Sequence, residues 1–290
     1  MEQWEPSESR GSRWVLRGAE GENPSAYSPM RKMTMDELIK IRPESLRPLF
    51  LEKKYEEQLL GTGTGFPVVE PSSGRAYLIT ARHNLTGRHA ETGECLCKAG
   101  GIPNRVSIHF HRNRMRGELA EFKIVDYRLE DRSGRIAWVE HPKDGASADI
   151  AALPLTFDED VFLSPFDLIE SHEREIGPAD PVSVIGFPFG KTSGDGLPLW
   201  ATGYMASEPN LSFEDKPILV IDCRARPGQS GSPVVSFRSD GIVGHNPFQG
   251  AWTAPSSDFL GVYSGRINNE SDLGIVWKRS SIRELINIDG

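Results

Sequence analysis

Three residues of this sequence have the types and positions to perform nucleophilic catalysis together. The first is Ser230, within Pro-Gly-Gln-Ser-Gly-Ser-Pro at residues 227–233 and directly before an apolar run. Glycine allows the backbone to turn sharply and to bring two N–H groups toward one point beside the hydroxyl, where they can stabilise an oxyanion. Alone, such a cluster of Gly, Ser and Pro is also typical of an ordinary turn.

The other two residues are His83 and Asp149, each at the boundary of an apolar run. His83 follows the run at residues 76–80, and Asp149 comes directly before the run at residues 150–153, with Asp144 as a nearby alternative. Singly, each also fits a loop histidine or an ordinary acid at a strand start. A serine hydroxyl needs a base to take its proton, and a carboxylate must hold the imidazole in the right tautomer. With Ser230 they therefore predict a catalytic His–Asp–Ser group.

The elements that must position these residues are predicted to be short β-strands. After residue 60, short apolar runs alternate with clusters of Gly, Pro, Asn and Asp, which is typical of an all-β chain built as barrels or a sandwich. The final segment instead has apolar residues at helical spacing, which predicts a helix over residues 280–288. The predicted strands are residues 65–69, 76–80, 106–111, 122–128, 150–153, 181–186, 199–205, 218–222, 233–237, 241–243, 260–263 and 273–277.

The N-terminal part has a different composition. Residues 1–34 are polar and rich in Gly, Ser, Glu and Pro, so we expect an extension without packed structure. Residues 34–41 predict a short capped amphipathic helix, and the apolar residues after Pro43 are expected to continue it. Those residues are Leu46, Leu49, Phe50 and Leu51.

Composition excludes several classes of function. The chain has 290 residues and a formal net charge of -8, so general binding to nucleic acid is not expected. Its three cysteines, Cys95, Cys97 and Cys223, do not make a disulfide framework and indicate a reducing compartment. A basic start followed by an apolar run is missing, and no window is long enough to span a bilayer. We therefore expect a cytoplasmic protein without a membrane partner.

Cysteines and histidines gather in one region, which raises the question of a metal. Their spacing matches no four-ligand pattern, so we expect neither a metal nor another cofactor. The residues are His89, Cys95, Cys97, His109 and His111. A further histidine, His141, lies in a loop rich in Pro, Lys, Asp and Gly and is expected at the surface.

Several stretches in combination resemble the catalytic domain of the trypsin-like peptidase family, and more closely its bacterial branch that includes the HtrA/Deg proteases. The resemblance covers roughly residues 61–288 and includes the order His, Asp, Ser. Its motifs are Gly-Thr-Gly-Phe at 63–66, Thr-Ala-Arg-His at 80–83, Ala-Asp-Ile-Ala at 148–151, Gly-Phe-Pro at 186–188, Asp-Cys-Arg-Ala-Arg-Pro-Gly-Gln-Ser-Gly-Ser-Pro at 222–233 and Gly-Val-Tyr-Ser at 261–264.

The resemblance implies a fold of two six-stranded antiparallel β-barrels with the active site between them. The domain would cover residues 35–290, with the first barrel at about 60–160 and the second at about 165–280. His83 would be the general base, Asp149 its orienting partner and Ser230 the nucleophile. The backbone N–H groups of Gly228 and Ser230 would form the oxyanion hole.

The implied activity is that of a serine endopeptidase acting on a protein or peptide substrate. A regulatory partner protein is compatible with this activity. Two alternatives stay open: a catalytically silent fold used as a binding or scaffold module, and an esterase with the same triad.

By the same resemblance, the substrate pocket has Arg224 at its floor and Tyr263, Ser264, Gly265 and Arg266 along its walls. An arginine there could pair with an acidic substrate side chain, which predicts cleavage after Glu or Asp. The alternative is that both arginines point to solvent and that the pocket takes a small apolar residue.

Two positions depart from the family pattern. Ser232 stands where a second glycine is usual, and it is expected to be tolerated if its φ is negative. Gln229 stands where some relatives have an aspartate that pairs with a new N-terminus, so no activation of that kind is expected.

Overall fold

The first sheet contains the strands that precede residue 170. The structure, a computed structural model, describes residues 41–97, 100–112, 122–169, 175–194, 196–246, 250–268 and 270–287. In this sheet the strands are β1 (Leu49–Tyr55), β2 (Gln58–Val69), β3 (Ala76–Thr80), β4 (Arg105–Arg112), β5 (Phe122–Arg128), β6 (Val139–Glu140), β7 (Ala151–Pro154) and β8 (Val161–Phe162).

These strands pair in the order β5-β4-β1-β2-β3-β7-β6, and β8 pairs with β4. The sheet therefore has eight strands, although β6 and β8 are only two residues long, instead of the six expected. Among the described residues, β5 and β7 share no ladder. Instead, the Tyr127 hydroxyl on β5 donates to the Thr156 carbonyl just after β7, at 2.6 Å. Buried apolar side chains such as Leu51, Leu78 and Ile108 fill the interior of this sheet.

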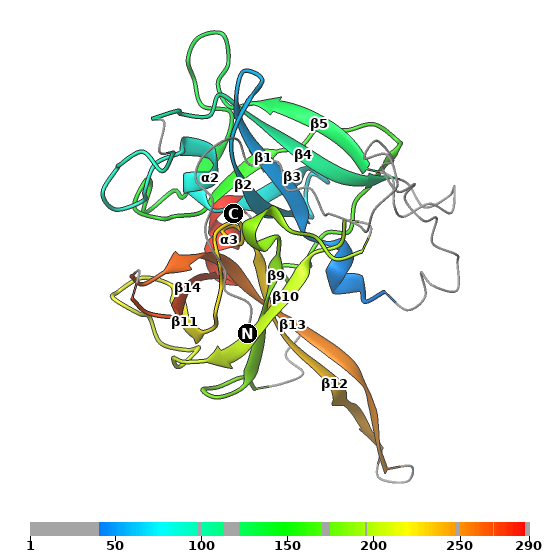
Figure 1. The fold of residues 1–290 in the computed structure, drawn as a ribbon. Helices are drawn as coiled ribbons and strands as arrows, with labels where there is room; N and C mark the ends of the chain where they lie inside the picture. The colour runs from blue at the N-terminus through cyan, green and yellow to red at the C-terminus, as the bar shows by residue number, and fades with distance from the viewer. Residues whose placement is uncertain are drawn as a thin grey trace, which may run out of the picture. The chain divides into compact units, whose positions relative to one another are not determined.

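The second sheet is a closed six-stranded barrel, as expected (Figure 1). Closure gives each of the six strands a partner on both sides along part of its length. The strands run in the order β10-β11-β14-β13-β12-β9. They are β9 (Pro181–Gly186), β10 (Leu199–Met205), β11 (Ile218–Asp222), β12 (Pro233–Asn246), β13 (Gly250–Arg266) and β14 (Leu273–Lys278).

Strands β12 and β13 form one long hairpin that projects from the rest of this barrel in Figure 1. The sequence predicted two separate strands at 233–237 and 241–243, but the structure has a single strand there. The pairing register shifts between Arg238 and Gly241, which is how a bulge lets a ladder continue through an irregular stretch.

Helical elements are few and short: η1 (Pro43–Leu46), α2 (Arg82–Thr86), η3 (Pro188–Gly190) and α3 (Arg279–Leu285). Helix α3 agrees with the helix predicted at the C-terminal end, and its residues Ile282 and Leu285 are buried. They join a core cluster that includes Phe66 from the first sheet and Val262 and Trp277 from the second. No helix in the described ranges is both long and apolar enough to cross a bilayer.

The helix expected beyond Pro43 is present only as the short 3-10 helix η1, which ends at Leu46, and the prediction was wrong for the residues that follow. Residues Leu49, Phe50 and Leu51 belong to strand β1, which pairs with β2 and β4. Leu49 and Leu51 are buried while Phe50 between them is less so, which is the alternation of a strand. The first barrel consequently begins before residue 60. The extension expected at residues 1–34, and the helix expected at residues 34–41 except for its last residue, fall within residues 1–40, which are outside the described residues.

Candidate active site

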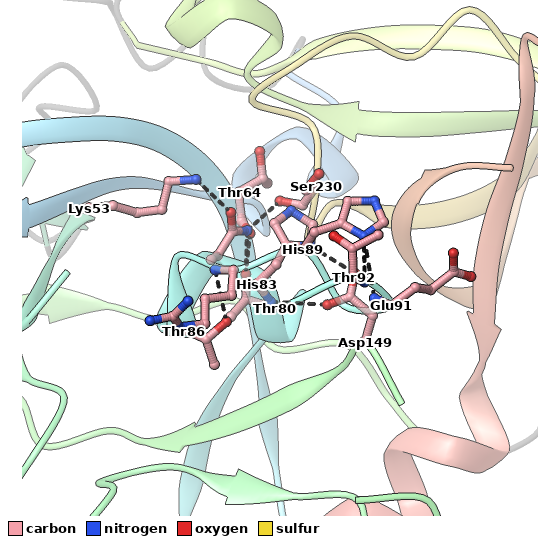
Figure 2. Close-up of polar contacts among 12 residues, drawn as sticks. Lys53, Thr64, Thr80, His83, Thr86, His89, Glu91, Thr92, Asp149 and Ser230 are labelled. Carbon is pink, nitrogen blue, oxygen red and sulfur yellow. Dashed lines mark hydrogen bonds and ion pairs between the residues drawn. The ribbon is translucent and has the colours of Figure 1, made fainter. Parts of the chain in front are cut away.

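His83 and Asp149 are joined by two hydrogen bonds (Figure 2). His83 lies in the first turn of α2, which begins two residues after β3 ends. Its ring Nδ1 is 2.7 Å from Asp149 Oδ2, and its backbone N–H donates to Asp149 Oδ1 at 3.0 Å. Since a carboxylate accepts at Nδ1, the proton sits on that nitrogen and Nε2 is left as the basic site. The arrangement orients the imidazole and can stabilise its charged form.

The neighbouring acid Asp144 takes a different partner. Asp144 Oδ2 lies 3.0 Å from Nδ1 of His141, and Glu284 of α3 lies 3.8 Å from Nε2 of the same ring. The expectation that His141 is a surface residue was wrong, because its ring is buried against Trp277. Asp144 therefore pairs with His141 in its own loop, and Asp149 is the acid that pairs with His83.

Ser230 lies in the loop between β11 and β12, and residues of β2 and α2 hold its carbonyl. That carbonyl accepts hydrogen bonds from the Thr64 N–H at 3.1 Å and from Asn84 Nδ2 at 2.8 Å. The next residue, Gly231, donates its N–H to the Tyr263 carbonyl at 2.7 Å. No hydrogen bond joins the Ser230 hydroxyl to another described residue. In unliganded sites, catalytic hydrogen bonds often form only when substrate enters.

Glycine is required at position 228. Its φ is +96°, and a Cβ there would lie 2.4 Å from the Phe187 carbonyl oxygen. The Pro227 carbonyl accepts the Phe189 N–H at 2.6 Å. Because C=O and N–H of a trans peptide point in opposite directions, this bond turns the Gly228 N–H away from Phe189. Among the described residues, neither this N–H nor that of Ser230 has an acceptor, so both are free to bind an oxyanion.

The two positions that depart from the family pattern are both buried. Ser232 is not among the residues with positive φ, and its side chain packs against Gly186. Gln229 uses its side-chain oxygen to accept the Arg226 N–H at 2.8 Å. Gln229 therefore stabilises the loop internally.

A cleft of about 490 Å³ contains the three candidate catalytic residues. All four predicted wall residues, Tyr263, Ser264, Gly265 and Arg266, line it as well. The cleft also includes residues that the sequence did not single out. Among them are the cation Lys216 and the apolar side chains Ile218, Ile275 and Trp277.

The predicted floor residue Arg224 does not line this cleft. Its side chain is 82% exposed and lies 3.5 Å from Asp272. Its neighbours Cys223 and Ala225 are buried, and the Ala225 N–H donates to the Cys223 carbonyl at 2.7 Å, which closes a three-residue turn with Arg224 at its centre. Arg226, two residues further, lines the cleft instead. Strand alternation would place Arg224 and Arg226 on the same side, so no local pattern in the sequence identifies Arg226.

The cysteines and histidines considered for a metal are placed separately. His109 packs its ring edge-on against Phe50 and lies 3.5 Å from Glu52, and burial lowers the pKa of His109. His111 is buried beside Phe122. In the part of the chain that the structure describes, no three His, Cys, Asp or Glu residues are grouped to hold a metal ion.

Comparison with known proteins gives one family. The family model for the trypsin-like peptidase domain matches residues 63–244. No curated protein matches the chain. Similar solved structures include a serine endoprotease from Yersinia pestis, with 12% identity and a TM-score of 0.46 over 84% of this chain and 62% of that chain. This chain thus spans less than two thirds of the Yersinia chain.

Two further structures are of the Rv3671c protease from M. tuberculosis. Its active form has 18% identity and a TM-score of 0.44, over 85% of this chain and 82% of that one. Its inactive form has 17% identity and a TM-score of 0.43, over 84% and 89% of the two chains.

Proposed function

This chain belongs to the trypsin-like peptidase family, and we propose that it is a serine endopeptidase that cleaves peptide bonds in protein or peptide substrates. The observation that carries the proposal is the doubly hydrogen-bonded pair of His83 and Asp149 at the same cleft that Ser230 lines. That combination supplies a nucleophile, a base and the group that orients the base.

In the first half of the proposed reaction, Ser230 Oγ attacks the carbonyl carbon of the scissile peptide. Its proton passes to Nε2 of His83, and the imidazolium is stabilised by Asp149. The carbonyl oxygen becomes an oxyanion that accepts from the N–H groups of Gly228 and Ser230. When the tetrahedral intermediate collapses, the C–N bond breaks and the leaving amine takes the proton from His83.

In the second half, water hydrolyses the acyl-enzyme. His83 removes a proton from water as the water oxygen attacks the ester carbonyl carbon. The bond to Ser230 Oγ then breaks, and Oγ recovers its proton from His83. The products are the carboxylic acid and the free enzyme.

For the substrate, we propose a preference for an acidic side chain at the cleavage site. The cleft walls carry three cations, Lys216, Arg226 and Arg266, while Glu91 and Asp149 are its acidic residues, and Arg226 also lies 3.4 Å from Asp272 outside the cleft lining. Asp149 is already engaged with His83. Arginine can bind a carboxylate through two parallel hydrogen bonds, so Arg226 and Arg266 replace Arg224 as the proposed recognition pair.

The test is labelling with a fluorophosphonate probe together with profiling on a peptide library. Wild type is expected to be labelled and to cleave peptides, and Ser230→Ala to do neither. Ser232→Ala is the matched control, since this buried serine lies two residues away, and it should still be labelled.

Three outcomes would overturn the proposal. Labelling that persists in Ser230→Ala would place the nucleophile elsewhere. A wild-type protein that is neither labelled nor active, while a control protease is labelled, would indicate a silent binding module. Turnover of esters without any peptide cleavage would contradict the endopeptidase and favour an esterase.

A further inference from the structure

Asn84 places a side-chain amide directly behind the proposed nucleophile. The amide is fully buried, and its Nδ2 donates to the Ser230 carbonyl at 2.8 Å and to the Thr80 hydroxyl at 3.0 Å. Thr80 in turn donates to the carbonyl of Thr64, whose N–H also reaches Ser230. The Ser230 carbonyl is therefore held by two donors, one on strand β2 and one on helix α2.

Lys53 determines which way this amide faces. An asparagine amide has a donor end and an acceptor end of nearly the same shape, and a half-turn exchanges them. Lys53 Nζ donates to Asn84 Oδ1 at 3.1 Å, and an ammonium group has no acceptor to offer (Figure 2). The half-turned amide would place its nitrogen against the ammonium and its oxygen against the Ser230 carbonyl. Lys53 thus excludes the orientation that would repel Ser230.

Strand β2 provides the space for this arrangement with two glycines. A Cβ at Gly63 would lie 2.8 Å from the amide carbon, oxygen and nitrogen of Asn84. A Cβ at Gly61 would lie 3.3 Å from Cε of Lys53. A larger residue at 63 would displace the amide, so the backbone of β2 is shaped around this pair.

We propose that Lys53 is a positioning residue for the hydrolysis proposed above: through Asn84 it fixes the Ser230 carbonyl and so aligns the nucleophile with His83. This inference rests on the proposed role of Ser230. Lys53 is not among the residues that line the cleft. Its loss should therefore lower the rate of attack while substrate binding stays the same.

The electrostatics of Lys53 give the role a pH signature. Burial lowers the pKa of Lys53 to about 8, and the nearby Asp149 and Cys97 oppose that shift. Below pH 8 the side chain is a charged donor that fixes the amide. Above pH 8 it becomes a neutral amine, which donates more weakly and can also accept, so its control over the amide is lost. The reaction rate should then fall on the alkaline side of pH 8.

The experiment measures the second-order rate of fluorophosphonate labelling, and kcat and KM on a cleaved peptide, from pH 6 to 10. Lys53→Met is expected to lower the labelling rate and kcat about tenfold or more with KM unchanged, since small misplacements of reacting groups are costly. Lys53→Arg keeps a permanent charge, so it should restore much of the rate and abolish the decline above pH 8. Lys54→Met, the adjacent lysine that pairs with Glu52, is the matched control and should behave as wild type.

A second measurement does not depend on activity. In a Ser230→Ala background, hydrogen exchange at the Thr64 amide reports whether the carbonyl at position 230 is held. Lys53→Met should accelerate that exchange, while the thermal unfolding midpoint shows that the protein remains folded. A labelled wild type whose rate and Thr64 exchange are both unchanged by Lys53→Met would overturn the role of Lys53 alone. An unlabelled wild type would instead refute the proposed function.

Discussion

The two carboxylate oxygens of Asp149 hold two different groups of His83. Oδ2 lies 2.7 Å from the ring Nδ1, and Oδ1 accepts the backbone N–H at 3.0 Å. One side chain therefore fixes both the start of helix α2 and the rotation of the imidazole that α2 carries.

Replacing Asp149 by Asn should separate these two tasks. An amide has one acceptor and one donor group, so it can satisfy only one of the two N–H groups and favours the wrong tautomer of His83. We expect kcat for peptide cleavage to fall on the order of 10³–10⁴-fold with KM little changed. Asp144→Asn, which alters the acid on the same loop, is the control. Equal losses in the two variants would show that the loop and not the His83 partner matters.

The Thr64 hydroxyl links the proposed oxyanion hole to the first sheet. It donates to the Gly228 carbonyl at 2.8 Å and accepts the Phe187 N–H at 3.2 Å. Thr64→Val keeps the shape but removes both bonds, and we expect kcat to fall about 10- to 100-fold, less than on removing an oxyanion donor outright. Thr64→Ser retains the hydroxyl and should stay near wild type. Unchanged kcat in Thr64→Val would exclude this link from the alignment of Gly228.

The proposed acidic preference can be tested with three arginines that differ in position. Arg226→Gln and Arg266→Gln should each lower kcat/KM for peptides with Glu or Asp at the cleavage site about tenfold, because a charged hydrogen bond is lost. Arg224→Gln should have no such effect, since that side chain is largely exposed outside the cleft. The readout is the ratio of acidic to neutral substrates for each variant. A ratio that falls in Arg224→Gln, but not in Arg226→Gln or Arg266→Gln, would contradict the proposed recognition pair.

The buried thiol of Cys223 should be unreactive in the folded protein. Burial raises the pKa of Cys223 to about 11, so almost no thiolate, the reactive form, is present at pH 8. We expect iodoacetamide at pH 8 to modify the partly exposed Cys95 and Cys97 before Cys223. Peptide mass spectrometry measures the extent of modification at each cysteine. In urea all three should react alike. Early modification of Cys223 would mean that this end of β11 opens readily.

Local pattern predicted the regular part of the fold well. Strands β3, β5 and β9 begin and end where the sequence placed them, and the run of β9 has turn-forming residues on both sides. The run at Leu49–Leu51 is short and fits both helical and strand periods, so the choice depends on partners. Strands β2 and β4 supply those partners, and their hydrogen bonds make it a strand.

The direction of a side chain was harder to predict. The family resemblance selected Arg224, but a three-residue turn with Cys223 and Ala225 buried on either side leaves Arg224 largely exposed. Likewise the loop composition around His141 suggested exposure, while packing against Trp277 buries the ring.

By itself the sequence determined which residues could react and in what order they follow one another, because each motif is a run of neighbouring residues at a strand end. Only the tertiary structure decided how the proposed nucleophile is held. Lys53 and Asn84 are 31 residues apart, and Asn84 and Ser230 are 146 apart. Such contacts arise when separate strands and loops pack together, so no local spacing records them. The same packing places the paired His83 and Asp149 beside Ser230 in one cleft.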